Sequence, residues 1–354
     1  MIGILDRYIS NRIILATGLV LAVLTALMAF FVFVDAISDY GKSNFGLYQL
    51  ARYVVLSQPR RLYEIFPVAT LIGALLGLSA LAVNAELVAM RAAGISVTGI
   101  VRSAMKVGLV FAVIATVMGE YVVPYAESQA QLGRAQALAQ AIQQGKSGLW
   151  LRDGASFVNI GEVLPDLTLL NVNIYSFQNE IQLRSQIQAE RAVYDNGEWR
   201  LQNVRRSEIE PKRISAHTAE SEPWKTGLTQ DVIGVFAVKP EGLSMLHLTR
   251  YIEHLRHNGQ STERYRLALW QKALMPLAVM VMVLLATPFA LGHTRAGRLS
   301  QNIFIGVMLG LAFIVISRIF GHFGLLYGIP PFFGAALPIV LFFFGALGLL
   351  RRAV

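Results

Sequence analysis

Six long apolar stretches lie along this chain, and one long polar block separates them into two groups of three. An α-helix of about 20 apolar residues is long enough to cross the core of a bilayer. Four of the stretches contain no charged residue, whereas Glu120 lies within the third and Arg318 directly follows the fifth. The predicted spans are residues 13–34, 65–83, 107–123, 273–292, 299–317 and 332–350. The pattern therefore predicts an α-helical membrane protein with six transmembrane helices.

The polar block has the alternation that is typical of β-strands. Leu170, Val172 and Ile174 alternate with asparagines, which is the period-two pattern of a strand buried on one face. The pair Asn196-Gly197 predicts a hairpin because both residues tolerate positive φ. Further strands are expected at residues 157–160, 181–183, 187–189 and 199–204. Short strands at this spacing favour an inserted all-β domain, either a sandwich or a jellyroll.

Two helices are expected to flank the β region. One continues from the third span over residues 129–143, and the other has an apolar face formed by Leu248, Tyr251, Ile252 and Leu255 at helical spacing. The expected organisation has three parts: residues 1–125 with the first three spans, residues 126–265 with the β-jellyroll domain and its flanking helices, and residues 266–354 with the last three spans.

Composition and charge agree with a membrane protein. Hydrophobic residues make up 55% of the chain and charged residues 15%, against about 25% charged in an ordinary soluble domain. The chain has no cysteine, which excludes disulfides, thiolate metal sites and cysteine nucleophiles. The net charge is +9, but residues 125–265 hold 15 basic and 16 acidic residues, so the excess lies among the apolar spans. Basic residues there mark membrane orientation, and nucleic acid is not an expected partner.

The short loops predict the orientation of the spans. With the N-terminus in the cytoplasm, nine basic residues lie on the cytoplasmic side and only Asp6 and Glu86 oppose them. The nine are Arg7, Arg12, Arg91, Arg102, Lys106, Arg295, Arg298, Arg351 and Arg352. We therefore expect both termini in the cytoplasm and the β domain on the opposite side of the membrane.

The residue types of an active site do not come together in this sequence. Gly145-Lys146-Ser147 is similar to the end of a phosphate-binding loop, but Gln140 stands where that loop needs a glycine. His254 and His257 fit a solvated helix face better than a metal site. No Ser-His-Asp arrangement is recognisable. We therefore expect no catalytic residue, metal or cofactor in this chain.

Two pairs of glycines are spaced four residues apart within the predicted spans. Gly73 and Gly77 lie in the second span, and Gly306 and Gly310 lie in the fifth. Small residues on one helical face let two membrane helices approach closely. The pairs predict helix packing rather than a specific function.

Four cations lie between the first two spans, on the side where the positive-inside bias disfavours them: Lys42, Arg52, Arg60 and Arg61. Arginine pairs with phosphate through two hydrogen bonds, so cations in this position suit an anionic lipid headgroup. The alternative is that they extend towards water or form local ion pairs with Asp35, Asp39 and Glu64. At this point both interpretations stay open.

Residues 84–95 predict a short cytoplasmic helix between the second and third spans. Glu86 stands early, where the helix dipole favours an anion, and Gly94 is expected to end the helix. Leu87, Met90 and Arg91 can form a face for another protein. A short helix between two spans suits contact with a motor subunit, and a plain interfacial turn is the alternative.

An ordered set of motifs accompanies these features: Leu5-Asp6-Arg7-Tyr8-Ile9, Phe66-Pro67, Glu86-Leu87-Val88, Gly119-Glu120-Tyr121-Val122, Gly148-Leu149-Trp150 and Tyr327-Gly328-Ile329-Pro330-Pro331. On these residues the chain resembles the permease subunits of the lipopolysaccharide-export ABC transporter, the LptF/LptG family, and most closely the LptG side of that family. The resemblance covers essentially the whole length.

The resemblance implies a fold of six transmembrane helices with a periplasmic β-jellyroll, in the inner membrane of a Gram-negative bacterium. It implies a substrate, lipopolysaccharide, that is extracted from the outer leaflet and passed to an LptA-like periplasmic bridge protein. The other implied partners are a second, LptF-like permease, a cytoplasmic LptB-like ATPase dimer that holds ATP and Mg, and a single-span LptC-like accessory protein.

The resemblance also implies roles for individual residues. Arg60 and Arg134 match cations that contact substrate phosphates, and Lys42 and Arg61 are neighbours of suitable charge. Glu86 matches the acidic residue of the helix that docks into the ATPase. The paired basic positions just after the first span are occupied here by Ser38 and Asp39.

Three alternatives stay open on the sequence. The first is the sibling, LptF-like permease of the same complex. The second is an ion-coupled secondary transporter that uses Glu120 or Arg318 as its membrane charge. The third is a membrane-bound hydrolase, for which the external domain lacks an assembled nucleophile and base.

Overall fold

The computed structural model describes residues 3–42, 45–137, 149–154, 156–163, 167–178, 182–195, 197–210, 213–228, 233, 240–257, 261–291 and 299–353. The chain separates into two compact units. One comprises Met1–Asp35, Ser57–Ala126 and Glu263–Val354 and holds most of the membrane helices. The other comprises Ala36–Leu56 and Glu127–Thr262 and holds the β-strands.

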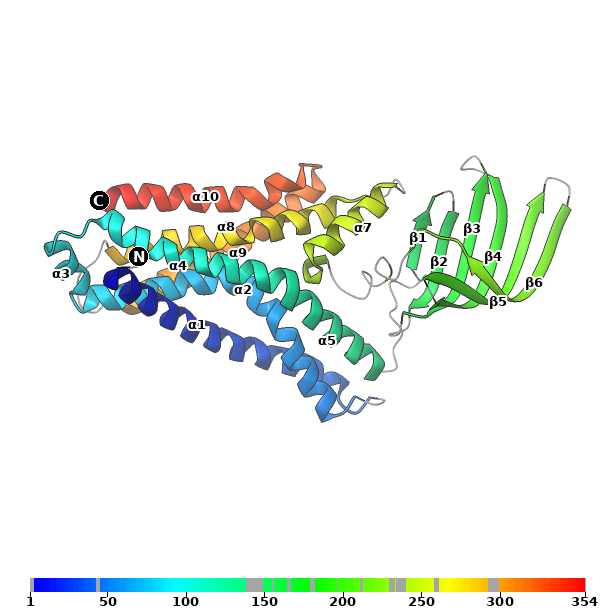
Figure 1. Cartoon of the computed structure of the whole chain (residues 1–354), viewed down its shortest axis with the longest axis horizontal. Helices are drawn as coiled ribbons and strands as arrows, with labels where there is room; N and C mark the ends of the chain where they lie inside the picture. Colours follow the sequence, from blue (N-terminus) through cyan, green and yellow to red (C-terminus); the bar gives the residue numbers. More distant parts are fainter. Residues whose placement is uncertain are drawn as a thin grey trace. The chain divides into compact units, whose positions relative to one another are not determined.

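The described helices are labelled in Figure 1: α1 (Ile4–Ala36), a 3₁₀ turn (Ile37–Asp39), α2 (Leu47–Val83), α3 (Glu86–Ala92), α4 (Val97–Val117), a π-helical turn (Met118–Val122), α5 (Val123–Ala137), a 3₁₀ turn (Pro240–Gly242), α7 (Met245–His257), α8 (Glu263–Leu291), α9 (Leu299–Leu326) and α10 (Pro331–Ala353). Within the described residues, six segments are long and apolar enough to cross a membrane, and each contains or overlaps one predicted span. The prediction of six membrane helices is therefore confirmed. The helices also extend beyond those spans, because backbone hydrogen bonding continues into the polar residues at their ends.

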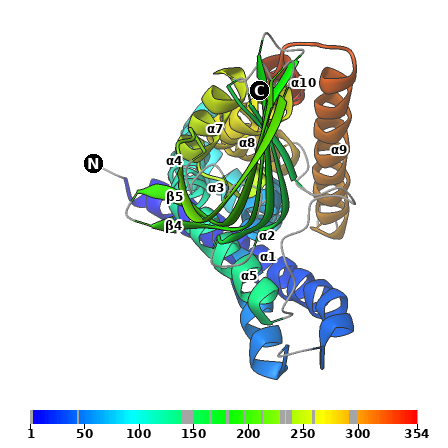
Figure 2. The ribbon, with the colours of Figure 1, turned by 90° about the vertical axis from the view of Figure 1, so that its right-hand side faces the viewer.

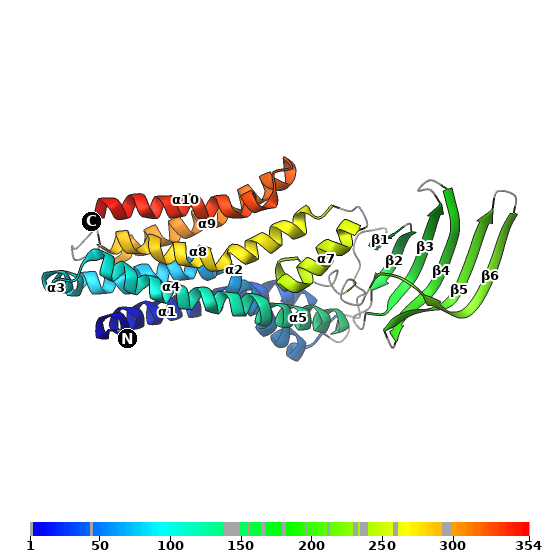
Figure 3. The same cartoon turned by 45° about the horizontal axis from the view of Figure 1, so that its top comes forward.

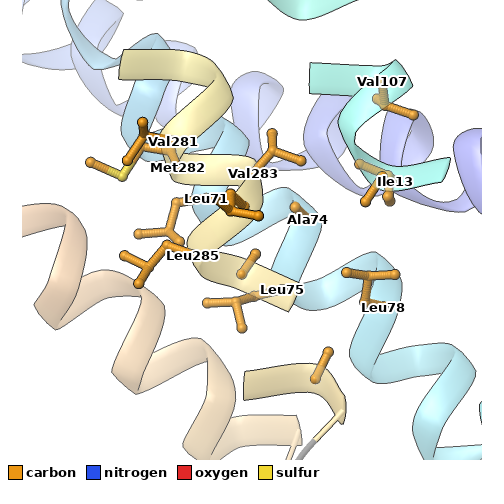
Figure 4. Close-up of a cluster of buried hydrophobic side chains, with 14 of the residues drawn as sticks. Ile13, Leu71, Ala74, Leu75, Leu78, Val107, Val281, Met282, Val283 and Leu285 are labelled. Carbon is orange, nitrogen blue, oxygen red and sulfur yellow. The ribbon is translucent and has the colours of Figure 1, made fainter. Parts of the chain in front are cut away.

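The core of the bundle lies around α2 and α8, which are mostly buried, whereas α1 and α9 are mostly exposed. Figure 3 shows α8 running between α4 and α10, which both pack against it. Figure 2 shows α9 at the margin of the bundle. The core side chains are mostly aliphatic and include Leu71 and Leu75 of α2 and Met282 and Leu285 of α8 (Figure 4). Large apolar side chains on the exposed faces of α1 and α9 are unfavourable in water. These faces are therefore suited to contact with lipid or with another apolar helix.

The glycines of α2 permit a close crossing with α1. A Cβ atom at Gly77 would lie 2.9 Å from the backbone oxygen of Arg12, and one at Gly73 would overlap Thr17. No side chain larger than hydrogen fits at either position unless the helices separate. The close helix packing predicted for this pair is confirmed.

The glycines of α9 permit a close approach of that helix to another part of α2. A Cβ atom at Gly306 would lie 2.8 Å from Cδ1 of Leu75, and Gly310 lies against α2 in the same way. Nearby, the amide of Asn302 donates a buried hydrogen bond of 2.9 Å to the hydroxyl of Ser79. The second predicted glycine pair is confirmed as a packing element, and α2 is the helix that both α1 and α9 approach.

The β region forms one antiparallel sheet of six strands in sequential order: β1 (Leu149–Asp153), β2 (Ser156–Val163), β3 (Leu169–Gln178), β4 (Gln182–Asp195), β5 (Glu198–Glu210) and β6 (Arg213–Trp224). The predicted all-β insertion is confirmed. Its described strands follow one another as a meander, a simpler connection than the paired Greek keys of a jellyroll. The strand segments expected at 181–183 and 187–189 belong to one long strand, β4, and Ile181 lies outside the described residues.

A row of unpaired positions crosses five strands of this sheet: Gly161, Asn171, Glu190, Asn203 and Glu220. The two asparagines have φ values of +52° and +53°, which asparagine tolerates better than most residues. Pairing resumes in the same register on either side of the row. We call this row the crease, and Figure 3 shows the bend of β4 and β5.

The crease corrects the predicted alternation of β3. Val172 and Ile174 are buried as expected, but Leu170 is only half-buried and Leu169 is fully buried instead. The positive φ at Asn171 turns the backbone and shifts the alternation by one residue. The sequence pattern could not predict this shift because asparagine fits an ordinary polar position on the exposed face equally well.

The described parts of the predicted hairpin and of the two predicted flanking helices are present. Gly197 turns the chain between β4 and β5 with a φ of +90°, while Asn196 lies outside the described residues. The helix expected at 129–143 is present as part of α5 up to Ala137, and the remainder lies outside the described residues. The apolar face predicted for α7 is confirmed, because Leu248, Tyr251 and Leu255 are all buried.

Candidate anion-binding site and coupling helix

The chain reverses direction sharply after α1. The 3₁₀ turn that follows α1 ends at Asp39, and Gly41 then adopts a φ of +81°, which its missing side chain permits. The backbone nitrogen of Gly41 donates to the carbonyl of Phe45, whose ring is fully buried. This compact turn fixes the carboxylate of Asp39 close to the side chain of Lys42.

Asp39 holds two cations that are far apart in the sequence. Nζ of Lys42 donates to one carboxylate oxygen over 2.8 Å, and Nη2 of Arg134 on α5 donates to the other over 2.5 Å. The Asp39 side chain is 11% exposed, against 58% for Lys42 and 28% for Arg134. With one carboxylate for two cations, this cluster, which we call the Asp39 cluster, has one positive charge in excess.

Tyr53 of α2 fixes the guanidinium of Arg134 from a second direction. Nη1 of Arg134 donates to the hydroxyl of Tyr53 over 3.2 Å, and Cζ lies 4.9 Å from the centre of the ring. A cation over an aromatic face is attracted by the charge distribution of the ring. Arg134 is therefore held in place by contacts that do not depend on Asp39 alone.

The other two predicted phosphate contacts, Arg60 and Arg61, lie in the unit that contains most of the membrane helices. Nε of Arg60 pairs with Oε1 of Glu64 over 3.0 Å, one turn further along α2. Arg61 is half-buried, and the structure gives it no ion pair with any of the described residues. Lys42 and Arg134 meet on Asp39, whereas Arg60 and Arg61 form a second positive region of their own.

The predicted coupling helix is α3, and its end is well defined. Gly94 has a φ of +89° and donates to the carbonyl of Arg91, while Ile95 donates to the carbonyl of Met90. These two hydrogen bonds form a Schellman motif, for which glycine is the preferred residue. The prediction that Gly94 ends the helix is confirmed.

Two of the apolar residues of α3 pack against the bundle. Leu87 is 3% exposed and belongs to the main apolar core, and Met90 packs against that core. Val88 and Arg91 are exposed, and Glu86 is half-buried. The exposed side of α3 therefore includes Val88 and Arg91, and Leu87 anchors the helix in the bundle core.

The N-terminal end of α1 is linked by side-chain hydrogen bonds to α4, the helix that follows the coupling helix in the sequence. The two oxygens of Asp6 accept from the hydroxyl of Ser103 and from Nζ of Lys106, each over 2.5 Å. The carboxylate and the ammonium balance each other. This pair links two spans that the sequence separates by a hundred residues.

One buried cation, Lys272, was not predicted from the sequence. Lys272 of α8 is 8% exposed and interacts electrostatically with Glu120, which lies in the π-helical turn after α4. Beside Glu120, a Cβ atom at Gly119 would lie 2.7 Å from the ring of Tyr63. The sequence signal for Lys272 is its position directly before the apolar run that begins at residue 273, where a charged residue is typical of the end of a span.

The part of the chain that the structure describes contains no group of three residues suited to hold a metal ion. The segment Gly145-Lys146-Ser147 lies outside that part, and so do residues 292–298 with Arg295 and Arg298. Among the described side chains, the most evident chemistry is the binding of an anion by arginine and lysine.

Comparison with known proteins agrees with this architecture. Residues 7–352 match the family described as lipopolysaccharide export system permease LptF/LptG. The chain is 37% identical to lipopolysaccharide export system permease protein LptG of Escherichia coli strain K12, over 99% of this chain and 98% of that protein. It is 36% identical to the protein of the same name from Haemophilus influenzae, over 97% and 96%. The chain therefore belongs to the LptF/LptG family of lipopolysaccharide export system permeases.

Proposed function

We propose that this chain is the LptG-like permease subunit of an ATP-driven transporter that extracts lipopolysaccharide from the outer leaflet of the inner membrane. The similarity to proteins named LptG over nearly the full length carries this proposal. The Asp39 cluster supports it, because a phosphorylated glycolipid needs cations at the edge of the apolar spans. The glycolipid would then pass to an LptA-like periplasmic bridge protein.

In this proposal the chain transmits movement and does not catalyse a reaction. ATP and Mg are bound by a partner, a cytoplasmic LptB-like ATPase dimer, and no catalytic residue is assigned here. An LptF-like second permease encloses the lipid in a cavity together with this chain, and a single-span LptC-like protein is a further partner. Both termini are cytoplasmic and the β domain is periplasmic, which agrees with the nine basic residues of the cytoplasmic loops.

The lipid phosphates are bound by Arg134, Lys42, Arg60 and Arg61. Arg134 is the best placed of the four, because Tyr53 fixes its guanidinium while one side of the side chain stays exposed. The excess positive charge of the Asp39 cluster favours an anion. The acyl chains lie against apolar helix faces, as expected for a lipid that leaves a bilayer.

The ATPase dimer moves the permease through α3. Glu86 and Arg91 contact the ATPase, and Leu87 and Met90 transmit the movement to the bundle core in which they pack. Gly94 gives the helix a fixed end, so that α3 moves together with the start of α4. This arrangement lets closure of the ATPase dimer narrow the lipid cavity.

The decisive experiment is ATP hydrolysis by the purified complex in nanodiscs with and without lipopolysaccharide. Glu86→Lys should lower the stimulated rate about tenfold or more, because a reversed charge at a docked helix repels its partner. Glu198→Lys makes the same change at an exposed position of β5 and should leave the rate unchanged. A wild-type rate for Glu86→Lys would contradict the coupling role.

The same preparation tests the identity of the complex. Co-purification of a second six-helix permease, an ATPase and a phosphorylated glycolipid is the expected result. Transport that needs a proton gradient and no ATP would overturn the proposal and favour an ion-coupled transporter that uses Glu120.

A further inference from the structure

A surface cavity lies between α4 and α10, at the end of the bundle that carries α3. Its volume is about 230 Å³, and its described lining consists of Val97, Thr98, Val101, Arg102, Met105 and Leu350. Four of these side chains are apolar, and Arg102 is charged. Val97 begins α4, three residues after the glycine that ends α3. Figure 1 shows the end of α10 and the start of α4 at the same end of the bundle as α3.

An exposed apolar track leads away from this cavity along α4. Met105 lines the cavity, and Leu109 and Val113 follow at intervals of four residues, so the three share one helix face. Leu109 is 56% exposed and Val113 is 57% exposed. The track belongs to a segment that is long and apolar enough to cross a membrane. It is therefore suited to an acyl chain that runs from the cavity towards the centre of the bilayer.

Positive charge gathers at the polar end of the cavity. Arg102 lines it, and Arg351 and Arg352 directly follow Leu350 in the last turn of α10. All three arginines are exposed, and none of them forms an ion pair within the described part of the chain. Basic pockets between membrane helices bind anionic lipid headgroups, and a guanidinium can offer a phosphate two hydrogen bonds.

We propose that this cavity binds one anionic phospholipid, with its phosphate on Arg102 and the arginines that end α10 and with an acyl chain along the α4 track. The lipid belongs to the leaflet on the side of α3, which is cytoplasmic in the orientation given under the proposed function. A zwitterionic phospholipid fits less well, because its ammonium group is repelled by the same arginines. The inference goes beyond the proposed function, because this lipid is a bound component and not the transported substrate.

The site has a consequence for the helix that follows α3. Both α4 and α10 pack against α8, so a lipid between them fills the space at the open side of this three-helix layer. The bound lipid contacts the first turns of α4, which continue from the end of α3. It therefore stabilises the position of α4 next to the proposed coupling helix.

The experiment uses the absence of native cysteine in this chain, which lets a fluorescent label be attached at one chosen position. Val110→Cys places the label beside the track, at a position that is 51% exposed. The labelled complex is reconstituted in neutral nanodiscs that contain small amounts of acyl-spin-labelled phosphatidylglycerol or phosphatidylcholine as quencher. Phosphatidylglycerol should quench at about a fivefold to tenfold lower mole fraction, because each arginine near the surface favours an anionic headgroup about fivefold. A complex without the introduced cysteine gives the background from partner subunits.

Variants in the labelled background then assign this preference to the cavity. Arg102→Gln should lower the preference for phosphatidylglycerol about fivefold, whereas Arg102→Lys keeps the charge and should retain most of it. Arg7→Gln removes an exposed arginine at the start of α1, which does not line the cavity, and should behave as wild type.

Three results would overturn the inference. Equal quenching by the two lipids would mean that the cavity makes only ordinary contacts with the bilayer. A wild-type preference in Arg102→Gln would place the selectivity elsewhere. Quenching by neither lipid would mean that another polypeptide covers the α4 track. The comparison of the two lipids stands even if an arginine variant does not fold, and none of these results depends on whether lipopolysaccharide is the transported substrate.

Discussion

The first membrane span, α1 with its 3₁₀ turn, has an aspartate near each end, and the two are used differently. Near the N-terminus, Asp6 meets one lysine and one serine, so its charge is balanced. At the other end, Asp39 meets a lysine and an arginine, so one positive charge remains. Both carboxylates accept two hydrogen bonds, and each has at least one donor that is distant in the sequence.

The difference distinguishes a structural contact from a candidate binding site. A balanced pair has no reason to attract a further ion, and it ties α1 to α4. An unbalanced cluster, by contrast, has a positive charge left to attract an anion. Counting charges around each carboxylate therefore distinguishes two sites that look alike in the hydrogen bonds they form.

The largest expected effect comes from reversing the charge at the unbalanced end. Arg134→Glu changes the Asp39 cluster from +1 to −1, so affinity for bis-phosphorylated lipid A should fall about tenfold to a hundredfold. Equilibrium binding to the purified complex measures this effect. Arg184→Glu makes the same change at an exposed position of β4 and should bind as wild type. If Arg134→Glu retained wild-type affinity for lipid A, the proposed difference between the Asp6 and Asp39 ends of the first span would be wrong.

An intermediate effect on stability is expected at the balanced end. Asp6→Asn removes the ion pair with Lys106, so the midpoint of thermal unfolding in detergent should fall by about 2–4 °C. Affinity for lipid A should not change, because this pair has no excess charge to offer. Lys106→Gln should cause a similar decrease, and the double variant little more than either single variant. An additive double variant would show that the two residues act independently.

The smallest expected effect concerns the contact between Tyr53 and Arg134. Tyr53→Phe removes the hydroxyl that accepts from Arg134 but keeps the aromatic ring, so lipid A affinity should fall about two- to fivefold. Tyr53→Leu also removes the ring and should cost more. Tyr175→Phe, which alters a ring stacked on Trp150 in the sheet, is the control and should change nothing. Equal affinities for all three variants would mean that Tyr53 does not position Arg134.

The membrane helices could be predicted from the sequence because hydropathy is a local property. Each span can be recognised from about 20 consecutive residues. The paired glycines Gly73 and Gly77 likewise indicated close helix packing. Their helix partner could not be predicted, since Thr17 and Arg12 of α1 have no distinctive pattern. Lys272 was missed for a related reason, because a single charge at the end of an apolar run reads equally well as a boundary.

The candidate site was predictable in its residue types and only partly in its contacts. Lys42 and Asp39 are three residues apart, so their pairing was among the local ion pairs considered. Arg134 lies 95 residues from Asp39, and only the fold shows that they share one carboxylate. In α3, the helical spacing grouped Leu87 with Arg91 on one face, but apolar burial draws Leu87 into the bundle.

The crease has a mechanical consequence for the β domain. It divides strands β2–β6 into two panels, and immediately on either side of it β3 and β4, and β4 and β5, pair in the same register. A change in the angle between the panels would therefore break none of the paired hydrogen bonds and would be absorbed at positions such as Asn171 and Asn203. The crease is thus the line along which the two panels can change their angle, as a hinge joins two rigid plates.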